Sequence, residues 1–329
     1  MSERQINSGE KIWVGVDIGG TKTAVVLSSE PPEMLGRIEF PTLPEQGPER
    51  VIDLIKQSIH QLVDSLGIDR ARLGGIGVSC GSPQNQAAGV IQAPPNLPTW
   101  VDVPITSILR EEFGIDCRLE NDADAGAVAE HRYGAGNGTR YMIFLTMGTG
   151  LGAGVIADGR LYRGASGQAG EIGHVRLTPS GPVGYHKAGS VEGWASGGGM
   201  AQVTAQVVDA AIERGEVTAM AARLRKNGAL TAKDVAEAAQ QGDALALRLL
   251  ESTGNRLGEA LAILVDLFNP ERIVVGGLAM RLGDSLLDPA RRTMEREALP
   301  ASAKICKVVP AALGERIGDV AAICVAMGM

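Results

Sequence analysis

The feature that most constrains the fold is a pair of segments in which a short apolar run meets glycines and a second apolar run follows. The first segment covers residues 12–27, with Gly19 and Gly20 between its runs. The second covers residues 141–157 and turns at Gly148 and Gly150. Short apolar runs joined by a glycine turn are typical of paired β-strands. The chain therefore presents one strand–glycine–strand unit twice.

Helices and strands are expected to alternate after each unit. From Val51 to Leu66, apolar residues recur every three or four positions, which predicts an amphipathic helix stopped by Gly67. The other expected elements before residue 140 are strands at 35–40, 73–78 and 117–119 and helices at 105–113 and 123–133. Beyond it they are a third strand after Gly159, helices near 194–214, 231–240, 243–268 and 279–297, strands at 272–275 and 305–309, and a helix from Gly314.

One arrangement used twice predicts an α/β protein with two domains facing a cleft, where the loops of both converge on ligands. A length of 329 residues is enough for two domains of ordinary size. We expect residues 11–121 plus 314–329 to form the first domain and residues 122–313 the second. The helix from Gly314 is expected to pack back on the first domain.

Composition excludes several classes of protein. Hydrophobic residues at 44% and charged residues at 21% are typical of a folded globular chain, and the 44 glycines follow no collagen period. A net charge of -7 with scattered basic residues disfavours nucleic acid or anionic membranes as partners. There is no membrane-spanning run and no signal peptide, so we expect a cytoplasmic protein. The widely spaced cysteines are interpreted as small apolar fillers: Cys80, Cys117, Cys306 and Cys324.

The first motif, Asp17-Ile18-Gly19-Gly20-Thr21-Lys22, follows the first predicted strand. Two glycines let backbone N–H groups approach a phosphate, Thr21 and Lys22 add a hydroxyl and a cation, and Asp17 could hold a water on Mg²⁺. A plain hairpin turn that needs glycine for positive φ is an equally good explanation of this motif alone.

The second motif, Gly148-Thr149-Gly150-Leu151-Gly152-Ala153-Gly154, formally contains the spacing of a dinucleotide fingerprint. That fingerprint must open a helix, whereas residues 155–157 read as another strand. Gly148, Thr149, Gly150 and Gly152 are therefore better interpreted as a second phosphate cradle. Two such cradles suggest one triphosphate held by both domains.

Two polar motifs suggest hydroxyl recognition. Asn121 and Asp122 stand at a predicted strand end entering a helix, where Asp122 could accept a proton from a bound hydroxyl. The alternative is that Asp122 merely caps the helix. Glu171 and His174, three apart in a glycine-rich stretch, offer a second pair of contacts, although such residues are more often ordinary surface groups.

Together, DIGGTK, NDADA, MGTGLGAG and GEIGHVRL, in this order, resemble the ROK family of sugar kinases and repressors within the actin-like ATPase superfamily. The resemblance runs from Trp13 through the last helix and implies two ribonuclease-H-like domains. It further implies that Gly276 and Gly277 contact adenosine and that Asn96, in the segment 95–100, borders the sugar.

The resemblance implies an ATP- and Mg²⁺-dependent hexose kinase, with glucose as the first choice of substrate and glucose 6-phosphate as product, and a homodimer formed through the second domain. N-acetylglucosamine, N-acetylmannosamine, mannose and fructose remain alternatives as substrate, and polyphosphate remains one as donor. Asp122 would be the general base. The residues implied to bind the sugar hydroxyls are Asn121, Asp122, Glu171, His174 and Glu192.

Two other classes of protein fit the sequence less well. A repressor of the same family would carry a helix-turn-helix module before the first glycine motif, where only about ten residues precede Lys11. A nucleotide-dependent oxidoreductase is disfavoured by the strand after the second glycine loop. The sequence therefore favours the kinase.

One departure from the family concerns zinc. Many members bind a structural zinc through a histidine and three cysteines, but this chain has Val183, Tyr185 and Ser190 at the cysteine positions. His174 and His186 alone fall short of four ligands, so no structural zinc is expected. The loop 178–193 must then be held otherwise, with Pro179 and Pro182 limiting its unfolded freedom and Tyr185 as an apolar anchor.

Overall fold

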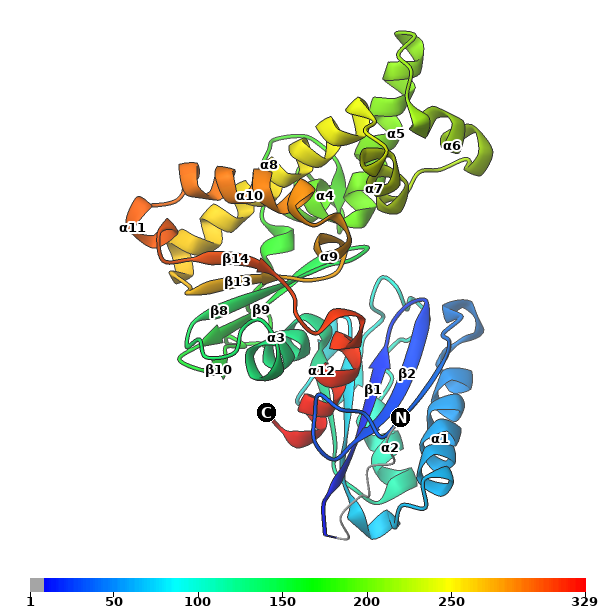
Figure 1. Cartoon of the computed structure of the whole chain (residues 1–329). Coiled ribbons are helices and arrows are strands. Elements are labelled where there is room, and N and C mark those ends of the chain that lie inside the picture. Colours follow the sequence, from blue (N-terminus) through cyan, green and yellow to red (C-terminus); the bar gives the residue numbers. More distant parts are fainter. Residues whose placement is uncertain (1–8) are drawn as a thin grey trace. The chain divides into compact units, whose positions relative to one another are not determined.

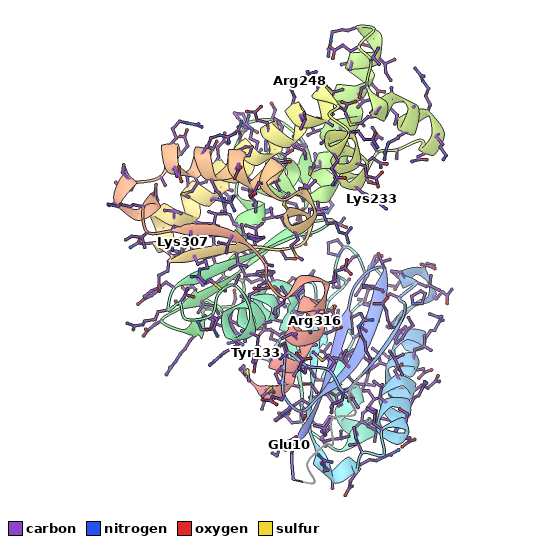
Figure 2. The ribbon with its side chains drawn as sticks, viewed as in Figure 1. Glu10, Tyr133, Lys233, Arg248, Lys307 and Arg316 are labelled. Carbon is purple, nitrogen blue, oxygen red and sulfur yellow. The ribbon has the colours of Figure 1, made fainter. Side chains whose placement is uncertain are left out.

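The computed structural model describes residues 9–329, and they form two compact units (Figure 1). The first unit comprises the described residues up to Tyr133 together with Glu315–Met329, and the second is Gly134–Gly314. Tyr133 and Arg316, both labelled in Figure 2, lie beside the two points where the chain passes between units. The boundary follows Tyr133 rather than residue 121, because α3 (Asp122–Tyr133) packs against α12 (Ile317–Met327) of the first unit.

The first unit is built on a five-stranded sheet in the order β3-β2-β1-β4-β7. Strands β1, β4 and β7 are parallel to one another, and β2 runs antiparallel to both of its neighbours, β1 and β3. The strands are β1 (Ile12–Ile18), β2 (Lys22–Ser28), β3 (Gly36–Pro41), β4 (Leu73–Cys80) and β7 (Cys117–Asn121). The remaining elements are α1 (Pro48–Ser65), α2 (Ile105–Phe113) and the short hairpin of β5 (Gln84–Asn85) and β6 (Val90–Ile91).

Alternation along β1 separates the two faces of this sheet. Val14 and Val16 are buried in one core with Ile55 and Ile59 of α1, as the period of two requires. On the other face, α12 comes so close that a Cβ on Gly77 of β4 would overlap the α12 backbone. The helix predicted from Gly314 therefore does pack on the first unit, as expected, although its α-helical part starts at Ile317.

The second unit repeats the same sheet plan. Its order is β10-β9-β8-β13-β14, with β8, β13 and β14 parallel and with β9 and β10 antiparallel to their neighbours. These strands are β8 (Met142–Met147), β9 (Leu151–Ala157), β10 (Arg160–Leu161), β13 (Arg272–Val275) and β14 (Lys307–Pro310). The duplication predicted from the two glycine-broken segments is confirmed.

The second unit also contains a series of helices. They are α4 (Val191–Ala195), α5 (Gly197–Glu213), α6 (Ala219–Asn227), α7 (Ala232–Gln240), α8 (Ala244–Phe268), α9 (Leu278–Leu282), α10 (Asp284–Glu297) and α11 (Pro300–Ala303). The long α8 lies close against α10, because Gly254 and Gly258 carry no side chain that would strike the α10 backbone or Pro289. Within residues 9–329 no helix is long and apolar enough to cross a bilayer.

Three helix predictions need correction. The single helix expected near 194–214 is α4 and α5, divided at Ser196, whose side chain caps α5 by accepting from the Gly199 N–H. The single helix expected at 279–297 is α9 and α10, divided at Gly283 with φ 55°. Helix α6 was not predicted, because its sequence has a weak apolar period.

Candidate active site

The predicted motifs of the first unit meet at one edge of its sheet. Ile18 of β1 lies opposite Cys80 of β4, and Cys80 lies opposite Asn121 of β7. The carboxyl ends of these three parallel strands are therefore level, and this edge is where open α/β sheets bind ligands. The register places the Asp17–Lys22 turn and the Asn121-Asp122 pair at the ends of strands that share β4 as neighbour.

Asp17 is enclosed from two sides. Its carboxylate is hydrogen-bonded by the Ser79 side chain from β4, and a Cβ on Gly318 of α12 would overlap its Oδ2. Burial raises the pKa of Asp17 to about 7, assisted by the negative charges of Asp122 and Asp319 and opposed by Ser79 and Lys22. A nearby divalent cation would stabilise the ionised carboxylate of Asp17, which fits its expected role in holding Mg²⁺ through water.

The glycine turn after β1 is not explained by backbone conformation. Neither Gly19 nor Gly20 has a positive φ, so a plain hairpin turn does not account for them. Gly20 is instead needed for a close approach, because a Cβ there would lie 2.7 Å from the Cβ of Asn96. Thr21 is exposed, and the Lys22 ammonium pairs with Glu39 at 2.9 Å. This exposed pair is weak, so Lys22 can exchange Glu39 for a phosphate.

Asn121 is the capping residue of α3. Its Oδ1 accepts from the N–H groups of Ala123 at 2.9 Å and Asp124 at 3.2 Å, and its Nδ2 donates to Ser82 Oγ at 2.8 Å. The sequence left open whether Asp122 was the cap. Since Asn121 satisfies these helix N–H groups, Asp122 is not required for that role.

Asp122 stands in the first turn of α3, where backbone N–H groups bind its carboxylate. Its Oδ1 accepts from the Ala123 N–H at 2.9 Å, its own N–H also bonds the carboxylate, and no side chain of the described residues donates to it. The residue is accessible to solvent, yet the dense protein around the carboxylate removes much of the bulk water and raises the pKa of Asp122. An accessible carboxylate of raised pKa is suited to accept a proton.

In the second unit, the turn between β8 and β9 presents exposed backbone. Gly148, Thr149 and Gly150 are exposed, and Gly152 lies at the start of β9 opposite Thr146 of β8. A Cβ on Gly148 would meet nothing within 4 Å, and its φ is not positive, so the fold itself does not require glycine there. A ligand that approaches the backbone would require it.

Gly276 and Gly277 follow β13 and reach the same end of β8. A Cβ on Gly276 would lie 3.0 Å from the Phe144 ring, and one on Gly277, with φ 64°, would overlap the Met147 carbonyl. Both glycines are thus explained by packing on β8. Their predicted contact with adenosine stays a prediction.

The three implied sugar contacts of this unit lie beside the 148–152 turn. A Cβ on Gly173 would overlap the Leu151 carbonyl and come 3.5 Å from Glu192 Cβ, so the Glu171–His174 turn lies against both. Glu171 and His174 are exposed. The structure therefore brings together Glu171, His174 and Glu192 within one unit.

The loop 178–193 is held by hydrogen bonds and by a tryptophan. The Gly189 carbonyl accepts from the N–H groups of Leu177 and Thr178, and Trp194 Nε1 donates to Thr178 Oγ1 at 2.7 Å. Ser190 is fully buried and caps α4 by accepting from the Gly193 N–H. Among the described residues no cluster of three or more metal-ligating side chains occurs.

Tyr185 is not the apolar anchor that was expected. It is 55% exposed and forms, with His186, the two-residue turn between β11 (Val183–Gly184) and β12 (Lys187–Ala188). Both turn residues have positive φ, 38° and 63°, as a type I′ hairpin requires. The Tyr185 ring lies near the rings of His174 and His186, at centroid distances of 6.1 and 5.5 Å.

Several residues of the site were missed from the sequence. Ser79 and Ser82 were missed, and so was Asp319, a buried carboxylate that influences Asp17 and pairs with Arg37 Nε at 2.8 Å. Isolated serines in an apolar strand carry no periodic signal. Asp319 did carry a sequence signal, because it is the single acidic residue of the apolar helix α12.

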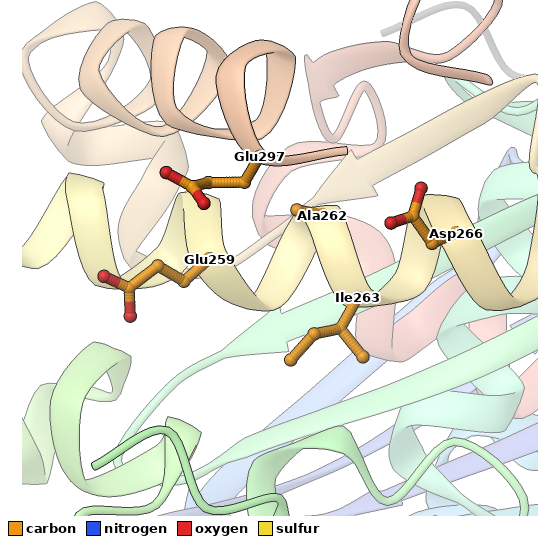
Figure 3. Close-up of a pocket in the computed structure, with 5 residues that line it drawn as sticks. All are labelled: Glu259, Ala262, Ile263, Asp266 and Glu297. Atoms are coloured by element: carbon orange, nitrogen blue, oxygen red, sulfur yellow. The ribbon is translucent and has the colours of Figure 1, made fainter. Parts of the chain in front are cut away.

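One hollow lies elsewhere in the second unit, between α8 and α10 (Figure 3). It measures about 280 Å³ and is lined by Glu259, Ala262, Ile263, Asp266 and Glu297. None of the predicted site residues lines it. Its three carboxylates are unsuited to a phosphate donor, so the hollow is not part of the candidate active site.

The comparisons with known proteins agree with the motifs. The model described as "ROK family" matches residues 13–327. A glucokinase of Halalkalibacterium halodurans is 34% identical, over 94% of this chain and 93% of its own, and one of Thermotoga maritima is 34% identical over 93% and 94%. The structure of a ROK glucokinase from Streptomyces griseus with glucose and AMPPNP superposes with a TM-score of 0.80 at 30% identity, over 97% and 100% of the two chains.

Proposed function

The chain belongs to the ROK family, and from this premise we propose that it transfers the terminal phosphoryl group of ATP to glucose, giving glucose 6-phosphate. Its fold is the two-domain actin-like ATPase fold of the ROK sugar kinases. The observation in the structure that best supports a kinase is that the two polar residues at the end of β7 have different roles. Asn121 caps the helix, and the Asp122 carboxylate, bonded by backbone N–H groups, has no side-chain partner among the described residues.

In the first unit, the Asp122 carboxylate would accept the proton of the attacking hydroxyl. Asn121 retains one Nδ2 hydrogen for a neighbouring hydroxyl, since its oxygen and the other hydrogen are used. Asn96, held against Gly20, would add a further contact. Fixed partners of this kind orient the sugar without any reorganisation at the moment of reaction.

In the second unit, Glu171, His174 and Glu192 would bind other hydroxyls of the same hexose. Their carboxylates accept hydrogen bonds, and the imidazole can either donate or accept. His174 is placed by its own backbone, because its carbonyl accepts from Lys187 Nζ at 2.7 Å.

The phosphates would lie against the two glycine turns. The exposed backbone of Gly148 to Gly150, the Gly19-Gly20 turn and Lys22 supply N–H donors and positive charge. When bound, Mg²⁺ neutralises charge that develops on the phosphoryl oxygens, and Asp17 is the acceptor suited to hold it through water. Gly276 and Gly277 would border the adenosine.

The test is ADP release with ATP, Mg²⁺ and a panel of hexoses. We expect the highest kcat/KM for glucose, over N-acetylglucosamine, N-acetylmannosamine, mannose and fructose. When polyphosphate replaces ATP no ADP can form, so glucose 6-phosphate is measured instead, and its rate of formation should be far lower. Tight glucose binding without ADP release would mean a sugar sensor rather than a kinase. A higher kcat/KM for another hexose would reassign the substrate.

We also propose a homodimer formed through the second unit. This unit carries the strongly exposed apolar residues Leu267 at 72%, Leu299 at 61% and Ile305 at 53%. Such residues are suited to burial against a second copy. Sedimentation of a monomer alone at micromolar concentration would contradict the dimer. The buried thiols and the use of ATP fit a cytoplasmic protein.

A further inference from the structure

The Glu192 side chain reaches the glycine turn between β8 and β9. Its Oε2 accepts from the Leu151 N–H at 3.0 Å. A Cβ on Gly150 would lie 2.7 Å from the same oxygen, so glycine at this position leaves room for the carboxylate. Oε1 has no hydrogen-bond partner among residues 9–329. One carboxylate therefore has one oxygen on the turn and one available for a ligand.

The residues that follow Glu192 bind the same turn. The Gly197 N–H donates to the Gly148 carbonyl at 2.8 Å, and the Gly198 N–H donates to the Thr149 carbonyl at 3.0 Å. Together with the Glu192 bond, three hydrogen bonds join residues 192–198 to residues 148–151. The turn is thus positioned by the chain that carries Glu192.

We propose that Glu192 is a positioning residue that couples sugar binding to nucleotide binding. This inference rests on the proposed function, in which Oε1 binds a glucose hydroxyl and the 148–150 turn binds phosphate. A hydroxyl on Oε1 fixes the rotation of the carboxylate and so holds Oε2 on the Leu151 N–H. The turn is then ordered before the nucleotide arrives, which lowers the entropic cost of nucleotide binding. By linkage, nucleotide strengthens glucose binding by the same factor.

A purely structural role makes a different prediction. If Glu192 only stabilised the turn or the first turn of α4, its loss would weaken nucleotide binding equally with and without glucose. Coupling instead predicts that the ratio of the two nucleotide affinities changes. That ratio is independent of how well the variant folds, provided the variant binds both ligands.

The experiment is calorimetric titration of Mg²⁺·AMPPNP into the full-length protein, without glucose and at saturating glucose. For the unmodified chain we expect the affinity to rise about 5-fold or more with glucose, within the usual range of coupling between sites. In Glu192→Ala the ratio should fall to about one, because both oxygens are gone. In Glu192→Gln the carboxamide oxygen can still accept from Leu151, so the affinity without glucose should be kept while glucose binds more weakly.

His174→Ala is the matched control. It removes a proposed sugar contact from the same unit, and among the described residues no hydrogen bond, ion pair or ring contact joins the imidazole to residues 148–151. Glucose should bind more weakly, but the ratio at saturating glucose should stay that of the unmodified chain. A ratio near one in the unmodified chain, or a full ratio in Glu192→Ala, would overturn the coupling. ADP release by the unmodified chain is measured in parallel, since its absence would reject the proposed function instead.

Discussion

The side-chain amide of Asn121 is held by Ser82, whose hydroxyl accepts from Asn121 Nδ2 at 2.8 Å. With Oδ1 on two helix N–H groups, this bond fixes the amide plane and leaves one N–H for a ligand. Strand β7 provides Asn121, and the loop after β4 provides Ser82. The orientation of the proposed sugar contact therefore depends on a neighbouring strand.

Replacing Ser82 with alanine should raise the KM for glucose about 5- to 10-fold, the effect of one neutral hydrogen bond. The kcat should change less, because Asp122 is untouched. Ser82→Thr keeps the hydroxyl and should restore most of the lost affinity. Steady-state kinetics with varied glucose measure both constants; an unchanged KM in Ser82→Ala would show that Asn121 does not need this partner.

Asp122→Asn should retain the fold and most glucose binding but lose about 10²–10⁴-fold in kcat. The asparagine oxygen can still accept from the Ala123 N–H, while proton acceptance is lost. Because the pKa of Asp122 is raised, kcat of the unmodified enzyme should fall as the pH falls through that raised pKa. Single-turnover kinetics and glucose titration check this. Turnover near normal would remove Asp122 from the chemistry.

Gly148→Ala should raise the KM for ATP about tenfold with little effect on glucose, since only open space surrounds the new methyl group and phosphate would have to approach past it. Gly150→Val should act less selectively, because a side chain at 150 would displace the Glu192 carboxylate, and the KM values for ATP and for glucose should both rise. An unchanged ATP KM in both variants would reject the phosphate cradle.

Asp17→Asn should make unfolding less sensitive to pH. A carboxyl group whose folded-state pKa is raised to about 7 stabilises the fold below its unfolded pKa of 3.8, and that stability is lost as the pH rises through about 7. The variant lacks this loss, so its free energy of unfolding at pH 8 should exceed that of the unmodified protein by up to ~4 kcal/mol. At pH 4 the advantage should vanish. Urea unfolding at both values is the measurement, and equal differences at pH 4 and pH 8 would contradict the assignment.

Protein purified without a metal-binding tag should contain no stoichiometric zinc. Ser190, at one of the expected cysteine positions, is instead the N-cap of α4, and Tyr185 is exposed in a hairpin turn. Elemental analysis measures the zinc content of the purified protein directly. A zinc chelator added with excess Mg²⁺ should leave activity unchanged, and a loss of activity would restore a zinc requirement.

Much of this fold could be read from local patterns. The glycine-broken strand pairs predicted the repeat, because a period-two apolar run ending in glycine depends only on neighbouring residues. The division at Ser196 was not predictable in this way, since its helix cap coincides with hydrogen bonds from Gly197 and Gly198 to a turn far back in the chain. Likewise Asn121 and Asp122 were found as a motif, but Ser82, the side chain that orients Asn121, comes from the loop after another strand.

The placement of α12 affects how the protein is made. Gly15 and Gly77 carry no side chain that would collide with this helix, and Gly318 of the helix lies against the Asp17 carboxylate. During synthesis, every residue of the second unit leaves the ribosome before α12 does. The first unit to be translated is therefore the last to complete its core, and the second unit folds while the strands around Asp17 still lack their covering helix.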